Sequence, residues 1–146
     1  MLLKIQTGQN NPILRKKSEP VKKLTTEIKR LIFDMFQTMR VKDGLGLAAP
    51  QIGKSLRIIV VNAGYDICII NPQITKSSEE KEVQTEGCLS LPEVYVPVER
   101  CKEIEVEGLN EKGEEIKLMV KDLLARIIQH EIDHLDGILI VDKKLN

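Results

Sequence analysis

The only two histidines of the chain lie four residues apart, in the segment HEIDH at residues 130–134. On a helix, residues at this spacing share one face, so the imidazoles of His130 and His134 can reach the same metal ion. Glu131, between them, can then address a water molecule on that metal. The alternative is an ordinary helix that carries two histidines without a ligand. The spacing and the intervening glutamate favour the metal site.

A catalytic metal site needs a third protein ligand and one open position for water. After His134 the chain contains no further His, Glu or Cys, which argues against the usual zinc-peptidase arrangement. An upstream cysteine is the better candidate, because a thiolate with two imidazoles suits Zn or Fe(II). Cys68 and Cys101 are expected to be small buried residues. Cys88 is the predicted ligand, because the glycine before it lets the backbone approach a ligand and the leucine after it offers a backbone N–H.

The composition limits the class of protein. A chain of 146 residues, 42% apolar and 30% charged, fits one globular domain. With 22 basic and 22 acidic residues the net charge is zero, which argues against direct nucleic-acid binding. No apolar run approaches the ~20 residues that span a bilayer, and the N-terminus is too polar for a signal peptide. Three cysteines without such a signal predict a reduced, cytoplasmic protein.

The candidate ligands must be positioned by a few elements. Residues 9–21 are polar and contain two prolines, which predicts an irregular surface arm. A helix should follow, because Thr25 or Thr26 can cap it and apolar residues recur at helical spacing over residues 28–39. The segment 44–53, with three glycines and a proline, cannot be a regular helix.

The rest of the chain is predicted to be mostly strand. Apolar and alternating runs predict strands at 56–61, 67–70, 104–109 and 115–120, the last two joined by a turn at 110–113. The charged segment 76–83 is expected to be a solvated loop or strand edge. The helix with the histidines should run from an N-cap at Asp122 to a C-cap at Gly137. The fold class is therefore α+β, with antiparallel or mixed sheets around the metal-ligand helix and one further N-terminal amphipathic helix.

Three segments resemble the signature blocks of the peptide deformylases, namely GLGLAAPQ at 44–51, EGCLS at 86–90 and QHEIDHLDG at 129–137. Each block alone is moderately specific, whereas all three in this order form a strong signal. The resemblance extends towards both ends and covers nearly the whole chain. It implies a single catalytic domain over residues 1–146.

The resemblance also implies the reaction. A peptide deformylase is a metal-dependent hydrolase that removes the formyl group from the formylmethionine of newly made polypeptides and releases formate. Carried over to this sequence, Cys88, His130 and His134 would bind the metal. In this family the metal is generally Fe(II), and Zn, Ni or Co can substitute. Glu131 would move a proton from water to the leaving amine.

The same resemblance implies how the substrate is held. Gln51, through its side-chain amide, and Leu89, through its backbone N–H, would bind the formyl oxygen. Leu45, Gly46 and Gly87 would pair with the backbone of the substrate peptide.

Supporting residues are also expected. An ion pair between Glu86 and Arg100 would brace the cysteine segment and match the family's pattern; the alternative is two solvated charges. Leu123, Ile127 and Ile128 could form the wall of a methionine side-chain pocket, or they could be plain core.

Two other functions remain open at this point. A zinc endopeptidase would lack its downstream third ligand here. A metal-stabilised binding module without activity would prefer four protein ligands, and only three good ones are found.

The implied partners are N-formylmethionyl nascent peptides. Many family members continue into a further C-terminal helix implicated in ribosome contact, whereas this sequence stops at Asn146. Ribosome docking is therefore an open expectation, and no membrane partner is expected.

Overall fold

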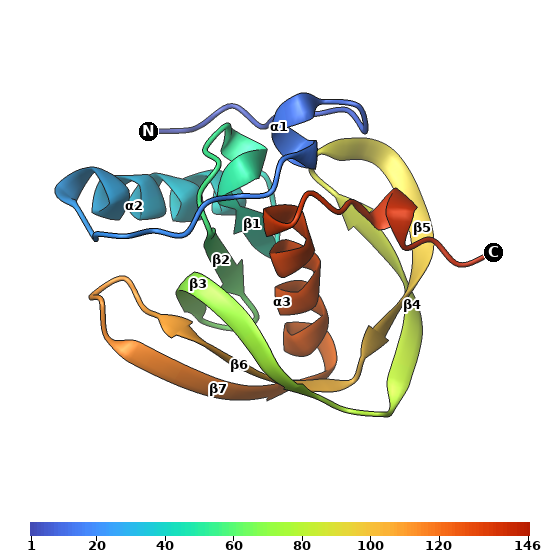
Figure 1. Cartoon of the computed structure of the whole chain (residues 1–146). Helices are drawn as coiled ribbons and strands as arrows, with labels where there is room; N and C mark the ends of the chain where they lie inside the picture. Colours follow the sequence, from blue (N-terminus) through green and yellow to red (C-terminus); the bar gives the residue numbers. More distant parts are fainter.

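The computed structural model describes residues 1–146 and has the α+β architecture predicted from the sequence (Figure 1). A five-stranded antiparallel sheet has the order β1-β2-β3-β6-β7, and β4 and β5 form a separate two-stranded sheet. The strands are β1 (Gly46–Ala48), β2 (Ile58–Asn62), β3 (Asp66–Ser77), β4 (Lys81–Cys88), β5 (Leu91–Cys101), β6 (Glu103–Leu109) and β7 (Glu115–Lys121). The helices are α1 (Pro12–Arg15), α2 (Thr26–Val41) and α3 (Asp122–Leu135), with 3₁₀ turns η1 (Ala49–Ile52) and η2 (Ile140–Asp142).

Helix α3 occupies the middle of the molecule and contacts strands of both sheets (Figure 1). Its apolar residues Ala125, Ile128 and Leu135 are completely buried in one core with the five-stranded sheet. Burying each large side chain of this kind contributes about 1.5–3 kcal/mol. Nine of its 14 residues are buried, so its polar side chains must find partners inside the protein.

Strand β2 is buried on both faces, as its uninterrupted apolar sequence predicts. Ile59 and Val61 point towards the core that includes α3, whereas Ile58 and Val60 point towards a second core beneath α2. This alternation is the two-residue period of a strand. The same strand therefore fixes both helices relative to the segment that contains β1 and η1.

One sequence prediction in the outer part of the fold is wrong, and another is decided between its two alternatives. The arm at 9–21 contains the single-turn helix α1, which forms because the Asn11 side chain accepts a hydrogen bond from Ile13 N and Pro12 opens the turn. For the segment 76–83, expected to be a loop or a strand edge, the structure shows mostly strand, since only residues 78–80 separate β3 from β4. Its charged side chains hid the strand, because the β4–β5 pair is exposed on one side and tolerates them.

The boundaries of α3 also differ from the prediction. Asp122 is the first helical residue, and the N-cap is Lys121, with no side-chain cap. The C-cap is Asp136, and Gly137 follows it with φ of 74°. A β-carbon on Gly137 would lie 2.3 Å from the Arg15 carbonyl oxygen, so the glycine is required both by its conformation and by the close approach of the arm.

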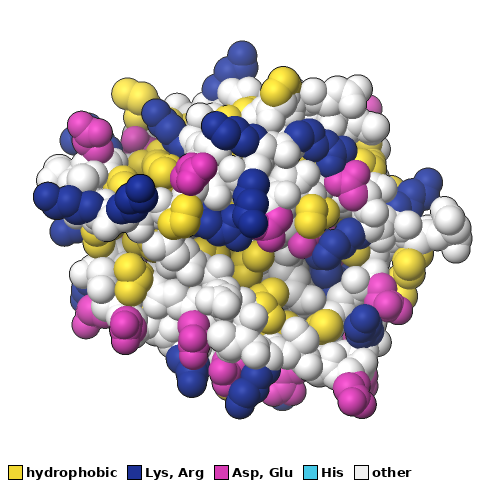
Figure 2. Space-filling model, in the orientation of Figure 1, with side chains coloured by type: hydrophobic (Ala, Val, Ile, Leu, Met, Phe, Trp, Pro, Cys, Tyr) yellow, Lys and Arg dark blue, Asp and Glu magenta, His cyan; other side chains and the backbone are white.

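The cysteines are all free. Cys68 is buried as expected, whereas Cys101 is half-buried at the end of β5. None of the helices combines the length and the apolar character that a membrane span requires. The molecular face in Figure 2 carries both basic and acidic side chains, in keeping with the zero net charge.

Candidate metal centre

Cys88 and the two histidines of α3 converge on one point. The Cys88 Sγ and one ring nitrogen of each histidine all lie within 4.8 Å of one another. Cys88 Sγ is 3.3 Å from His134 Nε2, and the two imidazole rings are 5.1 Å apart between centroids. The structure thus brings the three predicted ligands together, with a thiol from the end of β4 facing the i, i+4 pair of the helix. This donor set fits Zn or Fe(II).

The two imidazoles have opposite protonation tendencies. Burial lowers the pKa of His130, but the Glu131 carboxylate and hydrogen bonds to Cys88 and Glu86 raise it to about 10. The pKa of His134 lies well below its usual value, because burial and the charge of His130 disfavour a second proton. His134 is 1% exposed, and its neutral ring has a lone pair available for a metal.

Glu86 fixes the orientation of His130. Its Oε1 lies 2.9 Å from His130 Nδ1, which leaves Nε2 as the nitrogen that faces the ligand group. A carboxylate on the far nitrogen of a metal-ligating histidine sets its tautomer and raises its strength as a ligand. Burial raises the pKa of Glu86, but hydrogen bonds from Arg100 and His130 hold it well below its usual range.

The expected ion pair between Glu86 and Arg100 is confirmed. Arg100 Nε and Nη2 each donate to one oxygen of Glu86 at 2.9 Å, and both side chains are almost fully buried. Two further charged residues join this ion pair in a buried charged cluster, and the sequence analysis did not predict them. Arg126 donates to Glu86 Oε2 at 2.5 Å, and Asp133 accepts from Arg100 Nη1 at 2.5 Å. The one available signal was the position of Arg126, four residues before His130 on the buried face of α3.

Glu131 is buried with one oxygen unused. The residue is 4% exposed, and its Oε1 has no hydrogen-bond partner. Burial raises the pKa of Glu131 to about 7, although the charges of His130 and Arg100 act in the opposite direction. A buried carboxylate oxygen without a partner, next to a candidate metal group, is suited to receiving a proton from water.

The Gln51 side chain reaches the ligand group from η1. Its Oε1 accepts from Ala48 N at 2.9 Å, so Nε2 faces the site. Nε2 donates to Ser90 Oγ at 3.1 Å and lies 3.7 Å from Cys88 Sγ. Leu89, the other predicted donor, sits between these last two residues in the turn from β4 to β5.

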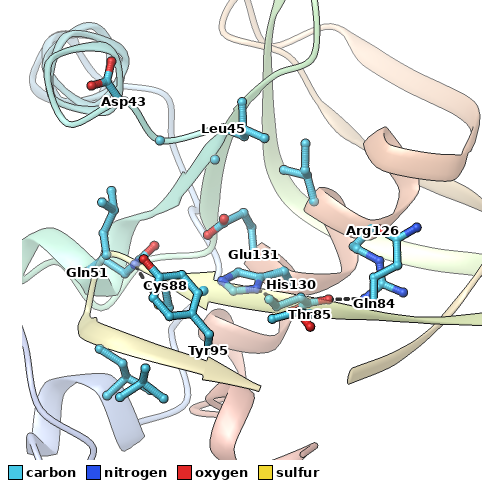
Figure 3. Close-up of a pocket in the computed structure, with 18 of the residues that line it drawn as sticks. Asp43, Leu45, Gln51, Gln84, Thr85, Cys88, Tyr95, Arg126, His130 and Glu131 are labelled. Carbon is cyan, nitrogen blue, oxygen red and sulfur yellow. Dashed lines mark hydrogen bonds and ion pairs between the residues drawn. The ribbon is translucent and has the colours of Figure 1, made fainter. Parts of the chain in front are cut away.

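A cavity of about 520 Å³ opens over this group (Figure 3). Eight of the nine predicted site residues line it, and His134 lies behind them. The eight are Leu45, Gly46, Gln51, Gly87, Cys88, Leu89, His130 and Glu131. Of the candidate methionine-pocket residues, Leu123 and Ile127 line the cavity, whereas Ile128 is fully buried in the core.

Comparisons with known proteins match both sequence and structure. The family model for polypeptide deformylase matches residues 2–146. The peptide deformylase of Pseudothermotoga lettingae is 52% identical over 132 residues, which cover 90% of this chain and 77% of that protein. The crystal structure of peptide deformylase from Thermotoga maritima has a TM-score of 0.96 at 41% identity, covering 100% and 99% of the two chains. A Met-Ala-Ser-bound deformylase from Acinetobacter baumannii has a TM-score of 0.94 at 32% identity, covering 98% of each.

Proposed function

Since the chain belongs to the peptide deformylase family and therefore removes the formyl group from newly made polypeptides, we propose which of its residues carry out the reaction. The observation that carries the proposal is the ligand group of Cys88, His130 and His134 beside the unpaired oxygen of Glu131. All four act within one catalytic domain that spans residues 1–146. The comparisons support neither a zinc endopeptidase nor an inactive binding module.

One divalent metal ion belongs at the ligand group, as the family is a family of metalloenzymes. Cys88, His130 and His134 would hold it, and Fe(II) is the native ion that we propose, with Zn, Ni or Co as substitutes. When bound, the metal supplies Lewis acidity, which lowers the pKa of water from 15.7 to roughly 7 and polarises a carbonyl group.

Glu131 moves the proton. Its free Oε1 accepts a proton from the attacking water and later donates it to the leaving amine of the methionine. A pKa near 7 allows the same carboxyl group to act as base and then as acid at neutral pH. Gln51 Nε2 and the backbone N–H of Leu89 donate to the formyl oxygen as negative charge develops on it. Loss of one such donor typically costs about 3 kcal/mol of transition-state stabilisation.

The substrate peptide adds to an edge strand. Strand β1 is an edge of the five-stranded sheet, and Leu45 and Gly46 line the cavity on that side. Gly87 of β4 lines it as well, so an extended formylmethionyl peptide can pair with backbone on both sides. The methionine side chain would rest on Leu123 and Ile127. The Acinetobacter baumannii relative has Met-Ala-Ser bound, which supports a peptide that begins with methionine as the ligand.

We place the reaction in the cytoplasm, where a free thiol ligand stays reduced. The partners that we propose are formylated nascent chains.

The direct test is formate release from formyl-Met-Ala-Ser by protein purified anaerobically with Fe(II). We expect turnover by the loaded enzyme, loss of turnover after chelation and recovery when Fe(II) is restored. A peptide with blocked ends and no formyl group, incubated in parallel, should stay intact. Protein that binds one metal ion per chain yet releases no formate would contradict the proposal.

The iron form should be sensitive to oxygen. Cys88 is half-buried and lines an open cavity, so oxygen can reach both the thiolate and Fe(II). We expect Fe(II) enzyme to lose most of its activity within hours in air, while enzyme loaded with Ni or Zn keeps its own level. Timed assays of the two forms check this, and full activity of the iron form after hours in air would contradict it.

A further inference from the structure

The side chain of Ser90 has no role in the reaction as described so far, yet it contacts a proposed donor to the substrate. Ser90 is 0% exposed, and its Oγ accepts a hydrogen bond of 3.1 Å from Gln51 Nε2. We propose that Ser90 is a positioning residue that aims the Gln51 amide at the formyl oxygen. The inference rests on the proposed function and adds a residue to it.

The amide of Gln51 is held at both of its ends. Its oxygen accepts from Ala48 N at 2.9 Å, which excludes the flipped amide, because a flip would set an N–H against an N–H. Its nitrogen has two hydrogens in the plane of the amide. When one of them is used on Ser90 Oγ, the direction of the other is fixed. That second N–H donates to Cys88 Sγ at 3.7 Å, so it points at the ligand group, and it is the N–H that would turn to the formyl oxygen of a bound substrate.

Backbone hydrogen bonds also hold Gln51 and Ser90 in place. Gln6 N donates to the Gln51 carbonyl oxygen at 2.7 Å, and Gly8 N donates to the Ser90 carbonyl oxygen at 3.0 Å. Two residues that are 39 positions apart in the sequence are thus fixed by one short stretch near the N-terminus, residues 6–8. The Ser90 hydroxyl is therefore held in a fixed position. A group can orient a neighbouring side chain, here the Gln51 amide, only if it is itself fixed.

Ser90 also connects the two proposed donors to the substrate, which are the Gln51 amide and the Leu89 backbone N–H. It directly follows Leu89, whose backbone N–H is the second proposed donor, and Cys88, the proposed ligand. Through Ser90, the Gln51 side chain is aligned to the same three-residue turn. Figure 3 shows Gln51 and Cys88 side by side at the cavity wall.

The test is a double-mutant cycle of S90A and Q51A, with kcat and KM measured on formyl-Met-Ala-Ser. S90A should lower kcat by about 2- to 10-fold, the effect of one ordinary hydrogen bond, with little change in KM or metal content. In the Q51A background the same S90A change should alter kcat by less than about twofold, because its target is gone. S18A is the matched control, since Ser18 is 3% exposed and its hydroxyl has no partner; it should leave kcat unchanged.

The outcomes separate this inference from the function on which it rests. Equal effects of S90A with and without Gln51, or a loss that appears in KM or metal content, would overturn it while wild-type turnover still supports the deformylase reaction. A wild type that releases no formate would overturn both. Thermal melts report whether S90A folds; if it does not, S90G, which removes the hydroxyl and adds no atom, takes its place in the cycle.

Discussion

Replacement of Glu131 by glutamine is expected to lower kcat for formate release by about 10²- to 10⁴-fold, the usual contribution of a general base and acid. Glutamine keeps the size of the side chain but cannot accept the proton of the attacking water. The three candidate ligands are untouched, so the E131Q protein should still bind one metal ion per chain. Steady-state kinetics together with metal analysis check both statements.

The comparison variant for E131Q is E79Q, which makes the same chemical change at an exposed residue in the turn between β3 and β4. It should keep wild-type kcat and metal content. If E131Q retained more than a tenth of the wild-type kcat with its metal bound, the proton would have to be moved by another group. If E131Q lost its metal instead, the glutamate would belong to the structure of the ligand group.

The second large effect is expected at Gly46, where the main chain passes close to Glu131. A β-carbon at Gly46 would lie 2.5 Å from Glu131 Oε2 and 2.9 Å from Ile127 Cγ2. Neither neighbour can yield easily, because Glu131 is 4% exposed and Ile127 is packed in the core. Strand β1 cannot retreat either, since Gly46 pairs with Val61 in the sheet.

We therefore expect G46A to lower kcat/KM by about 10²-fold, the size of effect produced when a catalytic group is displaced by about 1 Å. Overpacking should also cost about 1–3 kcal/mol of folding free energy, which thermal unfolding measures. G87A is the graded comparison, because its β-carbon would meet Tyr95 Cε1 at 2.7 Å, and that ring is 71% exposed and free to turn away. Near-wild-type kcat/KM in G46A would show that the carboxylate tolerates displacement.

The ligand helix could be predicted because its signal is local. The spacing of His130 and His134 depends only on helical geometry, and the third ligand followed from the types of residue left in the chain. Strand β2 could also be predicted from the sequence, since a strand that is buried on both faces has an unbroken apolar run.

The buried charged cluster of Glu86, Arg100, Arg126 and Asp133 could be predicted only in part. Glu86 and Arg100 match a family pattern, whereas Arg126 and Asp133 look like solvated residues unless the tertiary neighbours are known. Arg126 donates to the carbonyl oxygens of Val98 and Glu82 as well as to Glu86, and none of these partners is near it in the sequence. Strand β4 was missed for a similar reason, because its exposed side carries charges that a loop would also carry.

The buried Glu86 has a consequence for how the enzyme matures. It joins the strand that carries Cys88 to the helix that carries the histidines, through Arg100, Arg126 and His130, and every one of these contacts is made by protein atoms alone. Small zinc domains are unfolded without their ion because the ion supplies that junction. Here a buried carboxylate joins the same two elements, so we expect the fold to persist when a chelator removes the ion, in contrast to a small zinc domain.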